Sequence, residues 1–327
     1  MSRPVFVSAE ATKQALTWPQ MVATLRAAYA LPQRPAANPP RTVARGDGVW
    51  LRSLSSVLPS GSLMGAKLFG LSRRNRVSYL IALFDQESGE IVALLDANPI
   101  TAMRTGATSA VAVDLMARPG AMKVGVLGSG VEAHSHVRAI AAVPPVAALN
   151  VYSPSPDNRA RFAQTFAAEL GIPCRAVESE REAVAGADLV IAAARSRGEK
   201  PIVEGAWLND GMLVVSIGST LPEQREVDVA TIARCDLIVA DAPHEVSEGT
   251  GDFIAAAKEN VDFAAKLVSL NELVMGKVAA RVQAARLPMF KSVGSAVQDI
   301  AVAELAYTEA ARLGLATDLP IDISVKR

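Results

Sequence analysis

The sequence predicts an α/β fold class in which a Rossmann-type, doubly wound parallel sheet is inserted into a second, α+β domain. Two observations carry this prediction. Beyond residue 122, short apolar strands alternate with helical segments, which is the pattern of a parallel sheet. Up to about residue 97, strand-like segments instead follow one another with turn signals between them. We therefore place residues 119–284 in the Rossmann domain and residues 1–118 with 285–327 in the second domain.

The second domain is expected to begin with an amphipathic helix over residues 8–30, with Ser8 as a candidate N-cap and Pro32 beyond its end. Another helix opens at Asn98 and runs to about residue 117. Between these helices the sequence predicts strands, the last two joined as a hairpin around Asp85–Gly89. These strands are expected at residues 42–44, 49–54, 65–69, 77–84 and 91–95.

The alternating block has its own expected elements. Its strands are predicted at residues 123–127, 148–152, 189–193, 213–217 and 237–239. Its helices are predicted at residues 130–142, 156–170, 179–186 and 226–233. A last helix over residues 292–313 has apolar residues at helical spacing, and we expect it to return to the second domain.

Length and charge restrict the classes of ligand. A chain of 327 residues is long enough for two domains of ~150 residues each. Lys+Arg and Asp+Glu balance at 33 each, so net charge gives no reason to expect a nucleic acid or an anionic membrane as a partner. No run approaches the ~20 apolar residues that span a bilayer, and the first residues show no export pattern. A small-molecule ligand is the better expectation.

Cysteine and histidine are sparse. Cys174 and Cys235 have no zinc-like spacing, which fits a reducing, cytoplasmic location. His134 and His136 are two residues apart in a predicted helix, so they point to different faces and form a poor metal pair. We expect no metal site.

Gly128 and Gly130 lie in a G-x-G-x-x-A turn directly between a predicted strand and a predicted helix. In a Rossmann fold the first glycine permits the tight turn, and the second lets the backbone approach a pyrophosphate at the helix N-terminus. Such a motif alone is a weak signal, and a glycine turn without a nucleotide is the alternative. The strand–turn–helix context and the alternating block that follows favour a dinucleotide site.

The residues after the second strand of this block bear on the choice of cofactor. An NAD site usually has Asp or Glu there, which accepts from the ribose hydroxyls. This chain has Ser153, Pro154 and Ser155 instead, and Arg159 follows. The missing acid favours NADP(H). NAD(H) stays an alternative, because Asp157 could reach a ribose and Ser and Pro are also ordinary turn residues.

Four stretches together resemble one known family. They are MGAKLFG (64–70), NPITAMRTGATSA (98–110), SIGSTLPEQREVD (216–228) and PMFKSVGSAVQD (288–299), and the GSGVEA turn lies among them. In their order and spacing they resemble the ornithine cyclodeaminase/mu-crystallin family, over nearly the whole chain. The resemblance implies a Rossmann domain inserted into a substrate-binding and dimerisation domain, a homodimer, and a small imino or amino acid as substrate.

The resemblance also implies a substrate site, because Arg41, Lys67 and Arg104 match the family's substrate-site positions. The chemistry agrees: two arginines can hold a carboxylate as charge-assisted pairs, and a lysine beside an imine can donate a proton during reduction. Lys67 is therefore our candidate catalytic residue. Alternation along its strand places Lys67 on the face of Gly65. The alternative is a structural ion pair between Lys67 and Asp85 or Asp96.

Further residues are expected to contact the cofactor, by position or by resemblance. Thr105 lies in the family segment that adjoins the cofactor, although its small neighbours equally indicate close helix packing. Lys291 and Ser292 lie in a KS-x-G signature at the head of the last helix. Asp299 lies on the same face of that helix as Ser292 and is expected to be a structural partner. The full expected set of cofactor contacts is Arg104, Thr105, Gly128, Gly130, Val131, Glu132, Ser153, Pro154, Ser155, Arg159, Ala194, Ile217, Gly218 and Lys291.

The subtype within the family depends on one position. Cyclodeaminases of the family carry an aspartate where this chain has Thr220, and a threonine cannot act as a carboxylate base. The leading interpretation is therefore an NAD(P)H-dependent oxidoreductase that reduces small imino acids. An ornithine or lysine cyclodeaminase and a non-catalytic carboxylate binder are the alternatives. Arg73 and Arg74, after the Lys67 strand, indicate either a second acidic group on the substrate or ordinary solvated loop charges.

Overall fold

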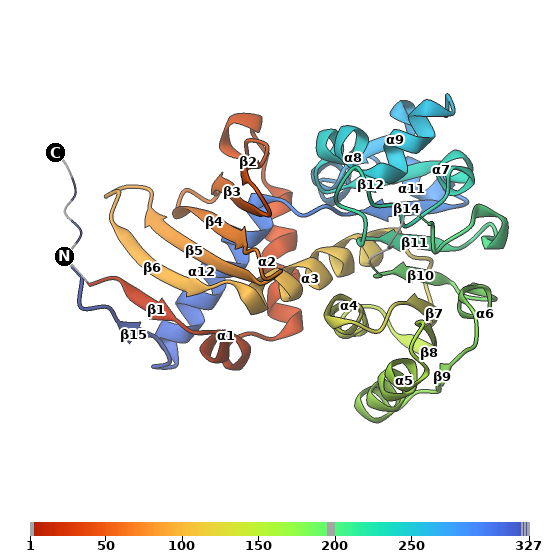
Figure 1. Ribbon diagram of the computed structural model, residues 1–327, viewed down its shortest axis with the longest axis horizontal. Helices are drawn as coiled ribbons and strands as arrows, with labels where there is room; N and C mark the ends of the chain where they lie inside the picture. The colour runs from red at the N-terminus through yellow and green to blue at the C-terminus, as the bar shows by residue number, and fades with distance from the viewer. Residues whose placement is uncertain (1–2, 195–199, 322, 324, 326–327) are drawn as a thin grey trace. The chain divides into compact units, whose positions relative to one another are not determined.

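The computed structural model describes residues 3–194, 200–321, 323 and 325 (Figure 1). The chain divides into two compact units. The terminal unit comprises Met1–Arg104 and Ser295–Arg327, and the central unit comprises Thr105–Gly294. The expected boundaries at 118/119 and 284/285 therefore both move. Most of the long helix α3 (Asn98–Met116) and all of residues 285–294 belong to the central unit.

The central unit contains an eight-stranded sheet in which every pairing is parallel. The strand order is β13-β12-β14-β11-β10-β7-β8-β9. Strand order reverses beside β7, which is where doubly wound sheets bind ligands at the carboxyl ends of their strands. The strands are β7 (Met122–Leu127), β8 (Val146–Tyr152), β9 (Cys174–Ala176), β10 (Leu189–Ala192), β11 (Leu213–Ser216), β12 (Leu237–Ala240), β13 (Leu267–Ser269) and β14 (Pro288–Lys291).

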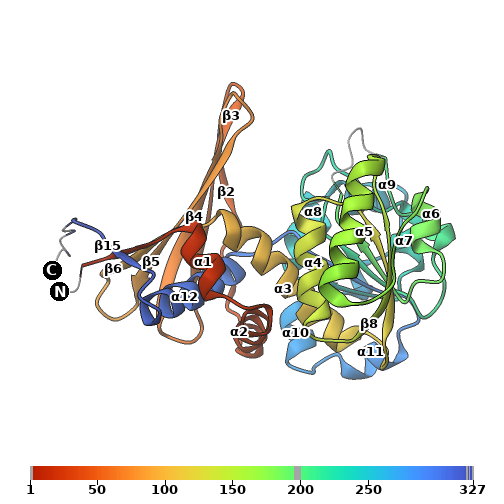
Figure 2. The ribbon, with the colours of Figure 1, turned by 90° about the horizontal axis from the view of Figure 1, so that it is seen from below.

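Helices lie on both faces of this sheet (Figure 2), as the continuous apolar strands require, since β10, β11 and β12 are buried along their whole length. Helices α4 and α5 pack together through His134, Phe162 and Phe166. The helices are α4 (Val131–Ala141), α5 (Pro156–Leu170), α6 (Glu180–Val184), α7 (Val229–Arg234), α8 (Pro243–Gly249), α9 (Gly251–Lys258), α10 (Leu270–Val274) and α11 (Ala279–Ala284).

The terminal unit contains a seven-stranded mixed sheet of order β15-β1-β6-β5-β4-β3-β2. Its consecutive strands β2 to β6 pair antiparallel, as expected, whereas β1 pairs parallel to β6. The strands are β1 (Val5–Val7), β2 (Thr42–Gly46), β3 (Val49–Val57), β4 (Leu63–Leu71), β5 (Val77–Asp85), β6 (Ile91–Asp96) and β15 (Thr317–Asp318). The unit also holds the helices α1 (Ala9–Ala15), α2 (Trp18–Ala30) and α12 (Ala296–Arg312).

Helix α12 packs across one face of this sheet, against β3, β4 and β5. Gly65 makes this approach close, because a Cβ atom there would lie 3.1 Å from the Ile300 side chain and 2.5 Å from the Ala82 carbonyl oxygen. The residues of β4 that alternate with Gly65 and Lys67 point to the other face, where Leu68 is 38% exposed. The sheet therefore has one face covered by α12 and one that is partly open.

Three expectations about elements are corrected. The helix expected over residues 8–30 is interrupted at Leu16, which is extended, and restarts after Thr17, whose backbone N–H donates to the Gln20 side chain, 3.1 Å. The last helix begins at Ala296 instead of residue 292, because Gly294 has φ 81° and Ser295 is its N-cap. The strand β14, which was not expected, inserts between β11 and β12.

Candidate functional site

Lys67 lies in β4 with its side chain buried beneath α12. Across the ladder it pairs with Leu54 of β3 and Ile81 of β5, both of them buried. Its ammonium group forms an ion pair with Oδ2 of Asp299, 2.6 Å away, and the other oxygen of this carboxylate accepts from Nε of Arg104, 2.9 Å. Asp299 is fully buried and Lys67 is 2% exposed. One carboxylate therefore holds two cations in the interior of the terminal unit.

A chain of hydrogen bonds extends from this ion-pair cluster. Nη1 of Arg104 donates to the side-chain oxygen of Gln298, 2.8 Å, and Nε2 of Gln298 donates to the Tyr29 hydroxyl, 2.9 Å. The Tyr29 hydroxyl also lies 3.0 Å from Oγ of Ser295. These residues come from α2, α3 and α12, so packing of three helices fixes the orientation of the Arg104 guanidinium. A guanidinium fixed in this way is preorganised to bind a planar carboxylate.

The electrostatics of this cluster suit proton transfer. Burial lowers the pKa of Lys67 from 10.5 to about 8, and the nearby charges of Arg104 and Arg41 lower it as well, whereas Asp299 opposes them. Burial alone would raise the pKa of Asp299, but its contacts with Lys67 and Arg104 outweigh burial and lower it. Asp299 is thus a carboxylate, and Lys67 is poised to gain or lose a proton near neutral pH.

The structure therefore brings two of the three expected substrate residues, Lys67 and Arg104, into one cluster. The third, Arg41, lies just before β2, is half-buried, and is close enough for its charge to lower the pKa of Lys67. The ion-pair partner of Lys67 is neither Asp85 nor Asp96 but Asp299. Asp299 was expected to be a structural partner, and the structure pairs it with Lys67 and Arg104, which the sequence did not predict.

An aromatic group extends the same sheet face beyond Lys67. The rings of Phe69 and Tyr79 stack at 5.1 Å, and Trp50 meets Phe69 edge-on at 5.4 Å. The guanidinium of Arg52 lies over the Trp50 ring, with its carbon 4.5 Å from the ring centroid, and only 8% of this arginine is exposed. Arg52 was not among the residues expected at the site.

In the central unit, the expected glycine turn lies between β7 and α4. Gly128 has φ 119°, and a Cβ atom there would lie 2.5 Å from the carbonyl oxygen of Ala193, so the turn requires glycine. At Gly130, by contrast, a Cβ atom would meet nothing within 4 Å. Gly130 precedes the first residue of α4, and the next residue, Val131, is 70% exposed. An open cradle at a helix N-terminus fits a dinucleotide pyrophosphate.

The residues after β8 are tied to this turn. Oγ of Ser129 donates to Oγ of Ser153, 2.8 Å, and Ser153 is buried. The Ser155 hydroxyl caps α5 by accepting from the Asn158 backbone, 3.3 Å. Pro154 is exposed between the two serines. Both hydroxyls thus have local hydrogen-bonding roles at the end of the second strand.

Arg159 is buried, and its guanidinium binds other residues of the central unit. Its Nη1 donates to the Ser153 carbonyl oxygen, 3.1 Å, and its Nη2 donates to the carboxylate of Glu178, which is 78% exposed. A cavity of about 340 Å³ adjoins the turn and is lined by Ser129, His134, Asn158, Arg161, Phe162 and Thr165. Arg161, which the sequence did not single out, is therefore the arginine that lines a cavity beside the glycine turn.

The expected cofactor residues Ala194 and Gly218 are held together by a buried carboxylate that the sequence did not reveal. Glu226 accepts from the backbone N–H of Gly218, 2.8 Å, of Ala194, 3.3 Å, and from the Ser216 hydroxyl, 2.6 Å. Burial raises the pKa of Glu226 to about 7, which the nearby charge of Lys291 opposes. Glu226 thereby fixes the ends of two adjacent strands, β10 and β11.

Lys291 has a different setting from the one expected. Its ammonium group is fully buried and binds Oδ2 of Asp252 and Oγ of Ser216, each at 2.9 Å. Asp252 in turn accepts from the backbone of Glu226, 2.6 Å. The side chain of Lys291 therefore links Ser216 and Asp252 in the interior of the central unit. The following residues are held by Asp241, which accepts from the Ser292 hydroxyl, 2.6 Å, and from two backbone N–H groups beyond it.

The remaining expected cofactor residues have varied surroundings. Thr105 is buried in α3. Its neighbour Gly106 packs against α4, since a Cβ atom there would lie 2.6 Å from the Ser135 carbonyl oxygen. Close helix packing thus accounts for this glycine. Glu132 is half-buried in the first turn of α4, and Ile217 is buried after β11.

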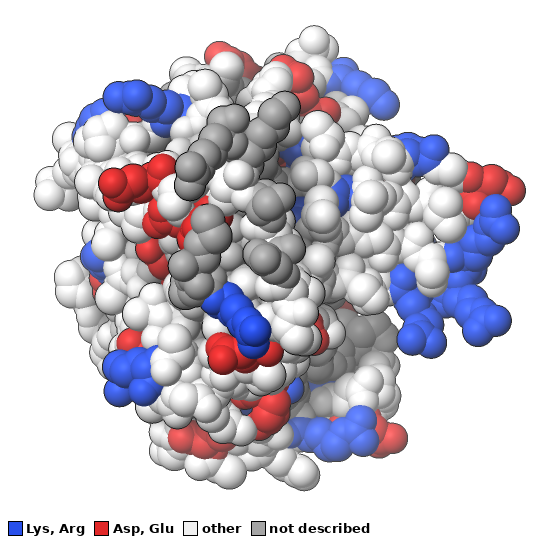
Figure 3. Space-filling view, turned by 90° about the vertical axis from the view of Figure 1, so that its left-hand side faces the viewer, with Lys and Arg blue, Asp and Glu red and all other residues white. Residues whose placement is uncertain are grey.

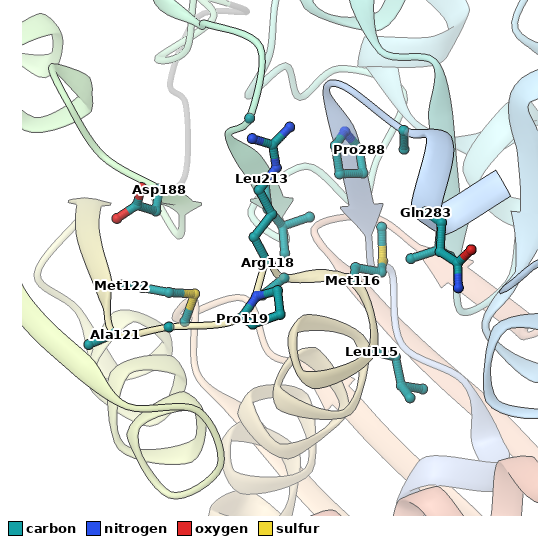
Figure 4. Close-up of a pocket in the computed structure, with 15 residues that line it drawn as sticks. Leu115, Met116, Arg118, Pro119, Ala121, Met122, Asp188, Leu213, Gln283 and Pro288 are labelled. Atoms are coloured by element: carbon teal, nitrogen blue, oxygen red, sulfur yellow. The ribbon is translucent and has the colours of Figure 1, made fainter. Parts of the chain in front are cut away.

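A cavity of about 410 Å³ lies at the amino ends of the parallel strands, opposite the end that carries the glycine turn (Figure 4). It is lined by residues at the amino ends of strands, among them Met122, Leu213 and Pro288, and by Arg118 and Asp188. Ligands of doubly wound sheets bind outside the carboxyl ends of the strands. This cavity is therefore not the expected cofactor site.

Charged side chains of both signs are spread over the face drawn in Figure 3, and Lys and Arg gather at its right-hand edge. Arg73 and Arg74 are exposed in the turn between β4 and β5, and Nε of Arg73 donates to the Asp47 carbonyl oxygen, 3.3 Å. The sequence left two interpretations open for these arginines, a second acidic group on the substrate or solvated loop charges. Their exposure favours solvated loop charges.

The described part of the chain contains neither a candidate membrane span nor a candidate metal cluster. Among residues 3–194, 200–321, 323 and 325, no helix is long and apolar enough to cross a membrane. Within the same residues, no group of three or more His, Cys, Asp or Glu side chains could hold a metal ion. The buried histidine, His136, bonds instead to Ser109, 2.9 Å, and to the Glu132 carbonyl oxygen, 2.7 Å.

The chain resembles known proteins over most of its length. A sequence profile of the ornithine cyclodeaminase/mu-crystallin family matches residues 50–313. The chain is 30% identical over 227 residues to the ketimine reductase mu-crystallin of Mus musculus, covering 69% of this chain and 68% of that protein. It is 30% identical over 269 residues to the iminosuccinate reductase of Paracoccus denitrificans, covering 80% and 82%.

Among solved structures, the Δ1-pyrroline-2-carboxylate reductase of Thermococcus litoralis, in complex with NADH and L-proline, superimposes with a TM-score of 0.88 at 28% identity. The alignment covers 96% of this chain and all of that one. The likeness thus extends over nearly the whole chain and includes both units. The chain belongs to the ornithine cyclodeaminase/mu-crystallin family.

Proposed function

We propose that this protein is an NAD(P)H-dependent reductase of small imino acids. The observation that carries the proposal is the buried ammonium of Lys67, whose pKa is lowered to about 8 beside the fixed guanidinium of Arg104. A buried lysine that titrates near neutral pH is suited to general acid catalysis. The family supports the proposal, since its members described above include reductases of ketimines, pyrroline-2-carboxylate and iminosuccinate.

The chain's own residues would bind and protonate the substrate. Arg104 and Arg41 would hold the substrate carboxylate through charge-assisted hydrogen bonds. Lys67 would donate a proton to the imine nitrogen as the carbon–nitrogen double bond becomes single. The nicotinamide, when bound, supplies the hydride that the imine carbon receives. Asp299 keeps Lys67 protonated and oriented, because it raises the pKa of Lys67 against the effect of burial.

The central unit would bind the cofactor. Gly128 and Gly130 form the pyrophosphate cradle at the N-terminus of α4, and Glu226 fixes the neighbouring strand ends. We propose a preference for NADP(H) over NAD(H), supported by the absence of an acid at Ser153 and by Arg161 in the adjacent cavity. If Arg161 binds a 2′-phosphate, Arg161→Gln raises KM for NADPH and leaves KM for NADH unchanged. An equal effect on both would contradict the preference.

The family also contains cyclodeaminases, and the loop after β11 bears on this alternative. Thr220 stands where those enzymes carry an aspartate, and its backbone N–H donates to the Gln224 side chain, 3.1 Å. A panel of imino acids, assayed by loss of NADPH and NADH absorbance, tests the reductase directly. Consumption of a cofactor with an imine supports the proposal. Ammonia release from ornithine without net cofactor consumption would show a cyclodeaminase, and ligand binding without turnover would show a binder.

We further propose a homodimer formed by the open face of the mixed sheet. Leu51, Val57, Leu68 and Leu80 lie on the face opposite Lys67, and each is between 38% and 52% exposed. Exposed apolar side chains on one sheet face are typical of an interface. Light scattering after size exclusion should give a dimer for the native protein and a monomer for Leu68→Glu with Leu80→Glu. Leu313→Glu, at another exposed leucine, is the control. A monomeric native protein would refute the dimer.

A further inference from the structure

We propose that Arg52 binds a second acidic group on the substrate, so that the preferred substrates are imino dicarboxylates. The inference rests on the proposed reductase function and specifies its substrate class. It comes from a second buried cation on the sheet face that carries Lys67. Arg52 is a specificity residue in this proposal, since it contacts the substrate side chain and takes no part in proton transfer.

The register of the sheet places Arg52 beside the catalytic lysine. Arg52 of β3 pairs with Phe69 of β4, which pairs with Tyr79 of β5. Lys67 is two residues before Phe69 in the same strand, so its side chain lies on the same face, one ladder step away. Diagonal neighbours on one sheet face lie within reach of long side chains. A single small molecule can therefore contact both cations.

The Phe69 ring links the two cations in space. The guanidinium carbon of Arg52 is 5.9 Å from the ring centroid, and Nζ of Lys67 is 5.3 Å from the same centroid. The two cations can be no farther apart than the sum of these distances. A four- or five-carbon dicarboxylate that bridges the two cations would place its imine carbon beside Lys67 and its distal carboxylate at Arg52.

Burial and aromatic contacts preorganise this guanidinium. Arg52 is 8% exposed, whereas arginine ordinarily remains in water. Its guanidinium lies over the Trp50 ring, which restricts its plane. A planar guanidinium in a largely desolvated site matches a carboxylate in both geometry and charge. The exposed arginines at the β4–β5 turn have neither property.

Matched pairs of substrates test this inference. Imines formed in situ from ammonia and oxaloacetate or 2-oxobutyrate have the same carbon count and differ in the distal carboxylate, as do those from 2-oxoglutarate and 2-oxovalerate. We expect a higher kcat/KM for the acidic member of at least one pair. Because a hydrogen bond to a charged group contributes about 1.5–3 kcal/mol, Arg52→Met should lower kcat/KM for the acidic member by about 10- to 100-fold and leave the neutral member within about 3-fold.

Two further variants keep the result interpretable. Arg52→Lys preserves the charge and should retain part of the preference even if Arg52→Met is unstable. Arg76→Met removes an exposed arginine from the β4–β5 turn and should change neither substrate. Equal losses on both members of a pair, or an intact preference in both Arg52 variants, would overturn the inference. A native protein that reduces only neutral imines would overturn it while leaving the proposed function standing. Absence of any imine reduction would refute the proposed function itself.

Discussion

Replacing Asp299 with asparagine should destabilise the protein strongly, and more at low pH than at high pH. Asp299 is fully buried and is bound by Lys67 at 2.6 Å and by Arg104 at 2.9 Å. Removing one partner of a buried ion pair costs about 3–5 kcal/mol, because the remaining charge stays desolvated. That is a large part of the about 5–15 kcal/mol by which proteins of this kind are stable.

The pH dependence follows from the pKa of Lys67. In the native protein this pKa is about 8, so Lys67 is charged at pH 6 and mostly neutral at pH 9. Asp299 raises the pKa of Lys67, and its loss lowers that pKa further. At pH 6 the variant must bury an ammonium without its counterion or give up the proton, both of which cost free energy. At pH 9 the amine is already neutral, so the loss of Asp299 costs less.

Urea denaturation at pH 6 and pH 9, followed by circular dichroism, measures this difference. The control is Glu169→Gln, which breaks the ion pair of Glu169 with Arg138 on the surface. The two side chains of that pair are 38% and 36% exposed, so we expect a loss below about 1 kcal/mol at either pH. A loss at pH 6 for Asp299→Asn that is no larger than the control's would refute the reasoning, as would an equal loss at the two pH values.

Three further predictions follow from the same structure. The kcat/KM for imine reduction should fall as pH rises through about 8, where Lys67 loses its proton, and the reverse oxidation should rise over the same range; a flat profile would exclude Lys67 as the acid. The pKa of Glu226 in the folded protein is about 7, above its ordinary value of 4.5. The protonated Glu226 therefore contributes about 3 kcal/mol of stability, at ~1.4 kcal/mol per pKa unit, which is complete below pH 4.5 and is lost as the pH rises to 7. Urea titrations across this pH range should show a smaller loss of stability in Glu226→Gln. Gly130→Val should keep the native melting temperature and weaken NADPH binding at least about 10-fold in a fluorescence titration, whereas Gly128→Val should destabilise the turn. Unchanged NADPH binding in Gly130→Val would mean that the cofactor binds elsewhere.

Much of the fold follows from local patterns in the sequence. The strands β3 to β6 and β7, β8 and β10 to β12 were predicted because apolar runs and turn residues mark them clearly. The break at Leu16 was predictable as well, since Thr17 and Gln20 form a capping-box pattern that the helical periodicity concealed. The strand β14 has four residues and no flanking pattern of its own, so its insertion between β11 and β12 was not foreseen.

The sequence predicted Arg41, Lys67 and Arg104 at the candidate site and missed most of the charged residues around them. Lys67 was identified through the resemblance to the family, and its place in an apolar strand agrees with the buried cation that the structure shows. Its partner, Asp299, is more than 200 residues away, and only the packing of α12 on β4 brings them together. Arg52 escaped notice because a single arginine in a strand normally indicates a solvated edge. Glu226 likewise was expected within a helix and instead lies buried before α7.

The proposed catalytic role of Lys67 is tested most directly by the turnover of Lys67→Met. Methionine retains length and apolar bulk, and Arg104 still pairs with Asp299, so no carboxylate loses its last partner. We expect the variant to fold, to bind NADPH as the native protein does, and to lose roughly 10²–10⁴-fold in kcat for imine reduction. If Lys67→Met reduces imines at the native rate, or if it fails to fold, Lys67 is structural and the active site lies elsewhere.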